Sequence, residues 1–143
     1  MDIARLGGVN EFPWVQGYFQ DRSLPVGVTQ LTPIRRIGDP SLLQGNRFVA
    51  PESGVYLLAT TGNQLPTAQA NKFMYINSSE HPVLYHRLRL DGNGDAMPPI
   101  SVIGKLPAGG YLLHTFQLTV AVTAFAHQWQ EWNQREFWFG RIA

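Results

Sequence analysis

Four histidines are the residues best suited to chemistry, because a neutral imidazole can bind a metal ion or transfer protons near pH 7. His81 and His86 are five positions apart, which places them on opposite faces of a strand and away from a shared metal ion. His114 and His127 have no adjacent acidic residue that could orient an imidazole. The histidines therefore predict neither a metal site nor a catalytic base.

A cluster of oxygen ligands follows one of the expected strands. Asp91, Asn93 and Asp95 alternate with glycines, and their oxygens suit a hard cation such as calcium. However, Ala96 and Val102 stand where an EF-hand loop has Gly and Glu. Asn-Gly and Asp-Gly are also typical of hairpin turns. We interpret this stretch as a long hairpin turn, with a calcium-dependent module as the alternative, and we expect no cofactor.

Known catalytic motifs are absent from the chain. The sequence contains no Gly-x-Ser-x-Gly elbow, no Gly-x-x-x-x-Gly-Lys phosphate loop, no His-Glu-x-x-His pair and no dinucleotide-binding glycine pattern. The formal net charge of +1 offers no electrostatic basis for binding nucleic acid. The apolar runs are shorter than the roughly 18 residues that a membrane helix needs. We therefore expect a non-enzymatic, soluble protein that contacts neither nucleic acid nor membrane.

Alternation of apolar and polar residues predicts β-strands along most of the chain. The longest such pattern begins at Leu112, where Leu112, His114, Phe116 and Leu118 share one almost wholly apolar face. Pro33 limits the pairing of the strand before it to a sheet edge. At 143 residues, the chain is long enough for one domain. The expected strands lie within 24–34, 55–60, 72–76, 83–91, 100–103, 112–126 and 135–142.

One corner between strands has a recognisable order of residues. Pro51 biases Ala50 towards an extended conformation, and the turn ends at Gly54. The order Phe48, Ala50, Pro51, Gly54 and Tyr56 resembles a motif of the complement globular-head and tumour-necrosis-factor-like jelly rolls. The resemblance implies an all-β fold, a single jelly-roll β-sandwich. It also implies a trimer, since proteins of this family usually assemble as trimers.

A second likeness lies near the end of the chain. In Phe137-Trp138-Phe139-Gly140 an aromatic residue precedes a glycine, as in the closing strand of those domains. The middle of the chain departs from the family, because Leu106-Pro107-Ala108-Gly109-Gly110-Tyr111 stands in place of a Leu-x-x-Gly-Asp-x-Val stretch. The register of the central strands therefore stays open.

The first part of the chain has no regular pattern. We interpret residues 1–23 as an extended N-terminal arm and residues 24–143 as the jelly-roll domain. Aromatic side chains are unusual in a disordered tail, so something has to cover them: either the chain's own domain or a neighbouring protein. The candidate partner-binding residues of the arm are Arg5, Phe12, Trp14, Tyr18, Phe19 and Arg22.

Self-assembly is the function that these patterns favour. Thr119, Ala121 and Thr123 form a small-residue face that would let another copy approach closely, and we predict a homotrimer there. We expect a phage capsid decoration or cementing protein that binds the major capsid protein or another virion protein through the arm. It would be made in the host cytoplasm, without disulfides, since the chain has no cysteine and shows no signal peptide. The alternative is a tail or host-surface adhesin in which Trp129 and Trp132 stack on a glycan.

Overall fold

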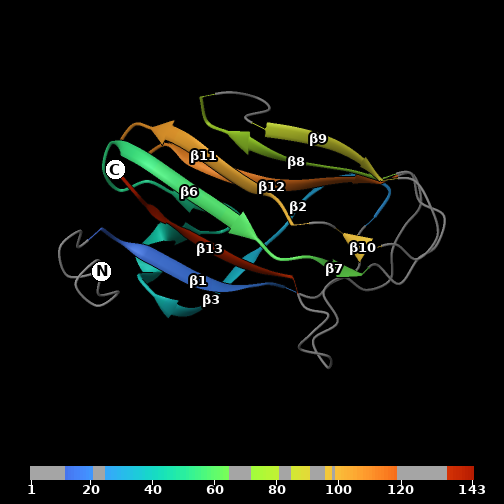
Figure 1. The fold of residues 1–143 in the computed structure, drawn as a ribbon, viewed down its shortest axis with the longest axis horizontal. Coiled ribbons are helices and arrows are strands. Elements are labelled where there is room, and N and C mark those ends of the chain that lie inside the picture. The colour runs from blue at the N-terminus through green and yellow to red at the C-terminus, as the bar shows by residue number, and fades with distance from the viewer. Residues whose placement is uncertain are drawn as a thin grey trace, which may run out of the picture.

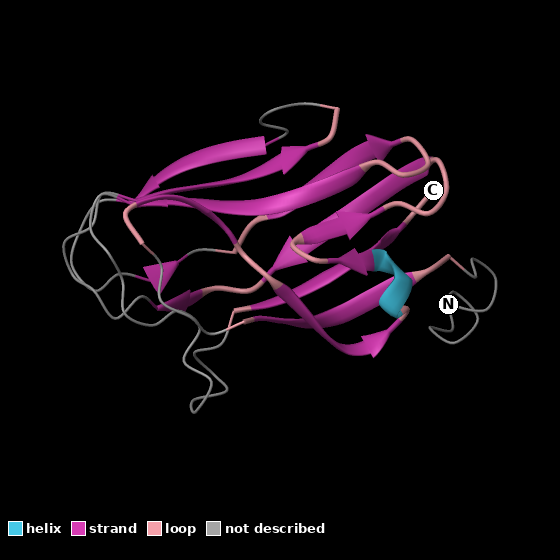
Figure 2. Ribbon diagram, turned by 180° about the vertical axis from the view of Figure 1, so that it is seen from behind, coloured by secondary structure: helices cyan, strands magenta, loops and turns pink. Residues whose placement is uncertain are grey.

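The protein is a two-layered β-sandwich. The computed structural model describes residues 12–20, 25–64, 72–80, 85–90, 96–97, 99–118 and 135–143. Within these residues one short 3₁₀ helix occurs, and the other regular elements are strands (Figures 1 and 2). This confirms the all-β fold expected from the alternating pattern. Among the described residues, no helix has the length and apolar character needed to span a membrane.

The strands form two large sheets and one small one. The five-stranded sheet has the order β11-β6-β13-β1-β3, and the six-stranded sheet has the order β4-β5-β12-β8-β9, with β2 also paired to β12. The small sheet pairs β10 with β7. All of the pairings among the described strands are antiparallel. In chain order the elements are β1 (Trp14–Phe19), β2 (Gly27–Gln30), β3 (Pro33–Gly38), η1 (Pro40–Leu42), β4 (Leu43–Gln44), β5 (Arg47–Val49), β6 (Gly54–Thr60), β7 (Asn63–Gln64), β8 (Lys72–Ser78), β9 (Tyr85–Leu90), β10 (Ala96–Met97), β11 (Ser101–Leu106), β12 (Tyr111–Leu118) and β13 (Glu136–Arg141).

The core lies between the two large sheets and is rich in aromatic rings. Phe48 and Tyr56, from the corner that resembles the jelly-roll family, are both fully buried. Phe48 packs edge-on against Phe137 with ring centroids 5.0 Å apart, and Tyr56 stacks on Phe139 at 5.4 Å. Every second residue of β12 from Leu112 to Leu118 is buried, which confirms that apolar face.

The prediction of an extended arm over residues 1–23 is wrong for its second half. Residues Trp14–Phe19 form β1, which pairs with β13 on one side and β3 on the other (Figure 1). Val15 and Phe19 enter the core while Trp14, Gln16 and Tyr18 face outward. The strand pattern is hidden in the sequence because the inward position between the two buried side chains is Gly17, and aromatic residues lie on both faces. A Cβ at Gly17 would collide with the backbone of Ile34 on β3, so this glycine lets the two strands approach closely.

The strand expected over 24–34 is divided in two. Pro33 does not end a strand but begins β3, at the edge of the five-stranded sheet, where a residue without an N–H is tolerated. The 3₁₀ helix follows Asp39, whose carboxylate accepts a hydrogen bond from the Ser41 backbone N–H at 2.9 Å. The closing strand expected over 135–142 is present as β13.

Candidate functional site

The outward side of the five-stranded sheet is unusually apolar. In β1, β6 and β13 alternate residues point into the core, and the residues between them point away from it. A solvent-facing sheet surface normally carries polar side chains at these outward positions. Here most of them are aliphatic or aromatic. We name this surface the apolar sheet face and define it by Trp14, Tyr18, Val55, Leu57, Ala59, Ile103 and Trp138.

Strand register places these side chains in continuous rows. Ile103 on β11 lies opposite Leu57 on β6, which lies opposite Gly140 on β13, which in turn lies opposite Trp14 on β1. In the next row Ala59 pairs with Trp138. The rows are open to solvent at both sides of the sheet, since Ile103 is 64% exposed and Trp14 is 39% exposed. The apolar residues therefore form one surface rather than scattered points.

Gly140 makes room for the two tryptophans of this face. A Cβ at Gly140 would lie 2.7 Å from Cη2 of Trp138 and 2.7 Å from Cβ of Trp14. Both tryptophans thus lie against the strand backbone at this point. Next to Trp138, bounded also by Ala59 and Glu136, the surface is hollowed by about 230 Å³. The face therefore has a raised aromatic part and a recess of side-chain size.

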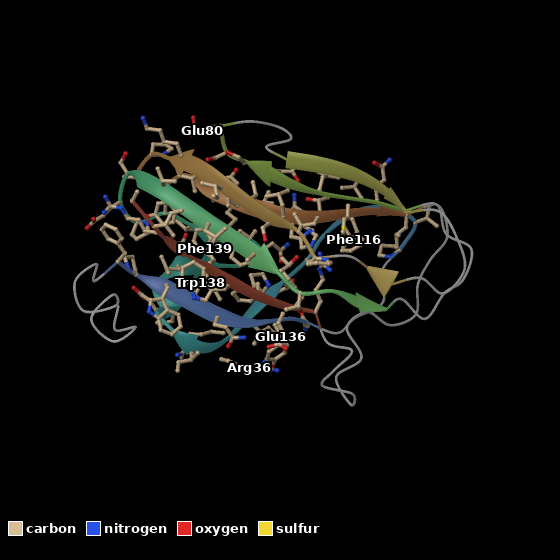
Figure 3. The ribbon with its side chains drawn as sticks, in the orientation of Figure 1. Arg36, Glu80, Phe116, Glu136, Trp138 and Phe139 are labelled. Carbon is tan, nitrogen blue, oxygen red and sulfur yellow. The ribbon has the colours of Figure 1, made fainter. Side chains whose placement is uncertain are left out.

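Charged groups lie at one margin of the apolar sheet face. Arg36 on β3 forms an ion pair with Glu136 at 2.5 Å, and the two residues lie close together in Figure 3. The guanidinium of Arg36 also lies over the Tyr18 ring, 5.0 Å from its centroid. Gln16 donates a hydrogen bond to the same Glu136 carboxylate at 3.1 Å. Because these groups are partly exposed, their attraction adds little stability. Their arrangement gives the face a polar rim.

The structure places the predicted arm residues in different environments. Phe19 is wholly buried and packs against Phe48, Phe137 and His114, so its assignment to partner binding is wrong. Trp14 and Tyr18 do lie on an outward face, but as members of a sheet rather than of an arm. Phe12 lies beneath the guanidinium of Arg141 at 4.4 Å. The chain's own domain therefore covers Phe19 fully and leaves Trp14 and Tyr18 on the outward face.

Several predicted positions lie outside the described residues. These are Arg5 and Arg22 of the arm, Thr119, Ala121 and Thr123 of the small-residue face, Trp129 and Trp132 of the suggested glycan site, and the suggested cation loop 91–95. Within the described part of the chain, no group of three His, Cys, Asp or Glu side chains is placed to hold a metal ion.

A buried arginine was missed by sequence reasoning. Arg135, immediately before β13, is fully buried between the sheets. Its Nε donates a hydrogen bond to Nε2 of His114 at 3.1 Å, and its terminal nitrogens donate to the Thr61 carbonyl and the Thr60 hydroxyl, each at 2.9 Å. Nothing in the sequence signals this cluster, because its members come from distant segments and arginine usually faces solvent.

Burial changes the protonation of both groups. It lowers the pKa of Arg135 to about 9, so the guanidinium stays charged at neutral pH. The pKa of His114 is lowered well below its ordinary value, first by burial and then by the positive charge of Arg135, while the backbone of Tyr75 acts in the opposite direction. A neutral His114 is what the geometry requires, because Nε2 has to accept the hydrogen bond from Arg135.

Comparison with known proteins identifies the fold. No protein-family model matches the sequence, and no curated protein matches it. Among solved structures, murine APRIL at pH 8.5 is similar, with a TM-score of 0.62 and 10% identity over 92% of this chain and 99% of that one. Murine APRIL at pH 8.0 gives a TM-score of 0.63 at 9% identity, with the same coverage. Rabbit GITRL gives 0.51 at 10% identity over 92% of this chain and 94% of that one. The chain therefore has the jelly-roll fold of the tumour-necrosis-factor-like ligands.

Proposed function

We propose that this protein is a non-enzymatic structural protein that assembles into a homotrimer through the apolar sheet face. The observation that carries the proposal is the continuous apolar surface from Ile103 through Leu57 to Trp14. Large exposed apolar patches on a folded domain are typical of contact surfaces. An apolar centre with a polar rim, here marked by Arg36 and Glu136, is also the usual anatomy of a protein interface.

A second copy of the chain is the occupant that we propose for this face. The resemblance to tumour-necrosis-factor-like jelly rolls implies a trimer. In a three-fold assembly each copy presents two different parts of one surface to its two neighbours. The apolar sheet face meets this requirement, because the projecting Ile103 and the recess beside Trp138 lie on different strands of it.

The finer role that we propose is decoration of a phage capsid. Three copies joined in one trimer bind a repetitive shell more tightly than one copy, because each further contact forms at a high effective concentration. The proposed partner is the major capsid protein or another virion protein. Residues 14–19 form a strand of the domain. We therefore restrict the proposed attachment to the capsid to residues before and after this strand, with Arg5 and Arg22 as the candidate contacts.

The oligomeric state is the first test. Light scattering should give a particle of about three times the 16.0 kDa chain mass at micromolar concentration. Ile103→Lys places a charge in the interface and should give folded monomers. The matched control is Val28→Lys, because Val28 is a similarly exposed aliphatic residue, at 59%, on β2 of the other sheet. A wild-type monomer, or a trimer that survives Ile103→Lys unchanged, would contradict the assignment of the face.

Capsid attachment needs a separate test. Purified trimer is mixed with particles that lack their own copy, and bound protein is measured after sedimentation. We expect binding by the full chain and loss of binding when residues 1–11 are removed, with the trimer still intact. If the full-length trimer does not attach, the decoration role fails, and a tail or host-surface role becomes the proposal to examine on a glycan array.

A further inference from the structure

The buried cluster around Arg135 and His114 joins the two sheets at one end of the sandwich. Arg135 immediately precedes β13 of the five-stranded sheet, whereas His114 belongs to β12 of the six-stranded sheet. A terminal nitrogen of Arg135 also lies 3.5 Å from the Met74 sulfur on β8. One side chain on one sheet therefore contacts two neighbouring strands of the other.

The backbone around this cluster depends on the same residues. The Arg135 carbonyl accepts a hydrogen bond from the Phe19 N–H at 3.0 Å. The Thr60 hydroxyl, which accepts from Arg135, also accepts from the Ile100 N–H and donates to the Ile100 carbonyl. Next to it, the Thr61 N–H donates to the Glu136 carbonyl and the Glu136 N–H donates to the Thr61 hydroxyl. If Arg135 moved, β1, β6 and β13 would all lose contacts at this end.

His114 lies in a closed environment, where no solvent can stabilise a second positive charge beside that of Arg135. Its ring is fully buried, stacks on Phe116 at 5.3 Å and meets the edge of Phe19 at the same distance. From β8 it faces the backbone of Tyr75, and from the other sheet it faces Arg135. Among the described residues around the imidazole, the charged side chain is that of Arg135.

We propose that His114 and Arg135 form an acid-sensitive clasp, in which protonation of His114 at Nε2 breaks its hydrogen bond with Arg135 and opens this end of the sandwich. The proton occupies the lone pair that accepts from Arg135, so the bond cannot persist. Two positive groups then face each other where water cannot screen them. The proposal does not rest on trimer formation, because the cluster lies within one chain.

The direction of the pH effect follows from the protonation states. In the unfolded chain His114 takes up a proton below about pH 6.5. In the folded chain its pKa is much lower, so the folded state excludes that proton. Stability is therefore present above about pH 6.5 and is lost as the pH falls below it. The ratio of folded to unfolded protein should fall by up to about tenfold per pH unit from this one site.

Hydrogen exchange of single amides tests the location of the opening. The full-length protein is compared at pH 7.5 and 5.5 at one protein concentration, with exchange rates corrected for their intrinsic pH dependence. We expect protection of the Phe19 and Thr61 amides to fall several-fold at pH 5.5. The Ala50 amide, which bonds to the Gly110 carbonyl in a different turn, is the internal control and should change less. Equal protection at both pH values for all three amides would overturn the proposal.

A variant that does not titrate tests the residue. His114→Gln keeps a side-chain acceptor for Arg135 and should remove the acid-dependent loss of protection, whereas His86→Gln reports what another histidine contributes. If His114→Gln does not fold, nuclear magnetic resonance of the wild-type imidazole decides the question. We expect His114 to stay neutral at pH 5.5 in the molecules that remain folded. Titration near pH 6.5 with the amides still protected would overturn the proposal.

Discussion

Tyr56 shows how one side chain can hold a corner of this fold. Its ring is buried against Phe139, and its hydroxyl donates a hydrogen bond to the Glu52 carbonyl at 2.7 Å, across the turn that precedes β6. We expect Tyr56→Ala to lower the free energy of unfolding by about 3–5 kcal/mol, because a large cavity remains. Tyr56→Phe keeps the ring and should cost only about 0.5–1.5 kcal/mol. Urea denaturation of both variants measures the difference, and equal costs would contradict this division of roles.

The same hydroxyl predicts a response to alkali. Burial raises the pKa of Tyr56 above 10.0, although the Glu52 hydrogen bond and Arg141 oppose the change. Above pH 10 the unfolded chain releases a proton that folded Tyr56 keeps, so stability should fall as the pH rises. Tyr56→Phe should show a weaker fall between pH 9 and 11 in thermal melts. Identical slopes would show that other groups cause the alkaline loss.

Gly17 controls how closely β1 and β3 approach. A methyl group at this position would run into the Ile34 carbonyl on β3, which is backbone and cannot rotate away. Gly17→Ala should therefore destabilise the protein by more than about 3 kcal/mol, above the usual range for overpacking, because the clash is with backbone. Gly45→Ala is the matched control, since Gly45 has open space around it and only its φ of +61° opposes a side chain. That strain costs roughly 1–2 kcal/mol, so comparable losses in the two variants would argue against a tight contact at Gly17.

At the scale of elements, β1 is the strand on which the five-stranded sheet depends. It lies between β13 and β3, so its removal would leave one edge of each without a partner. We expect a chain lacking residues 1–20 to aggregate, because unpaired strand edges recruit other chains. A chain lacking residues 1–11 retains β1 and should keep a β-type circular dichroism spectrum and a cooperative melt. Cooperative melting of the shorter chain would contradict the central place of β1.

Some elements could be predicted from the sequence because their two faces differ. In β12 the buried positions Leu112, Phe116 and Leu118 share one face, and the polar Thr115 and Gln117 lie on the other, so the period of two is visible in the sequence. In β1 the corresponding inward position is Gly17 and the outward ones are Trp14 and Tyr18, so composition does not distinguish the faces. Pairing with β13, far along the chain, decides which side is buried. Local patterns cannot contain that information.

The candidate sites were predictable only in part, for a related reason. That aromatic residues near the beginning of the chain need cover is visible in the sequence, and Phe19 does receive it. The apolar sheet face is made by rows that run across strands, from Ile103 to Trp14, and a row becomes visible only when the register is known. Arg135 lacks any local signal, since Thr60, Met74 and His114 surround it from other strands.

At the scale of the whole molecule, assembly and stability should be linked. If the trimer buries the apolar sheet face, dissociation and unfolding share one equilibrium, and the melting temperature should rise with protein concentration. Ile103→Lys should remove that dependence while Val28→Lys retains it. Calorimetry over a hundredfold range of concentration provides the measurement. A melting temperature independent of concentration in the wild-type protein would mean that the folded unit is a single chain.

The pairing of β1 with β13 has a consequence for biosynthesis. Trp14 lies opposite Gly140, so the first described strand to leave the ribosome needs the last one as its neighbour. Strand β6 also lacks a neighbour until β13 is made, because it too pairs with β13. During translation the centre of this sheet is therefore open, with two strands awaiting a segment that has not yet been made. The five-stranded sheet can close only after β13 has left the exit tunnel. Until then the nascent chain exposes the aromatic core side chains that the finished fold buries.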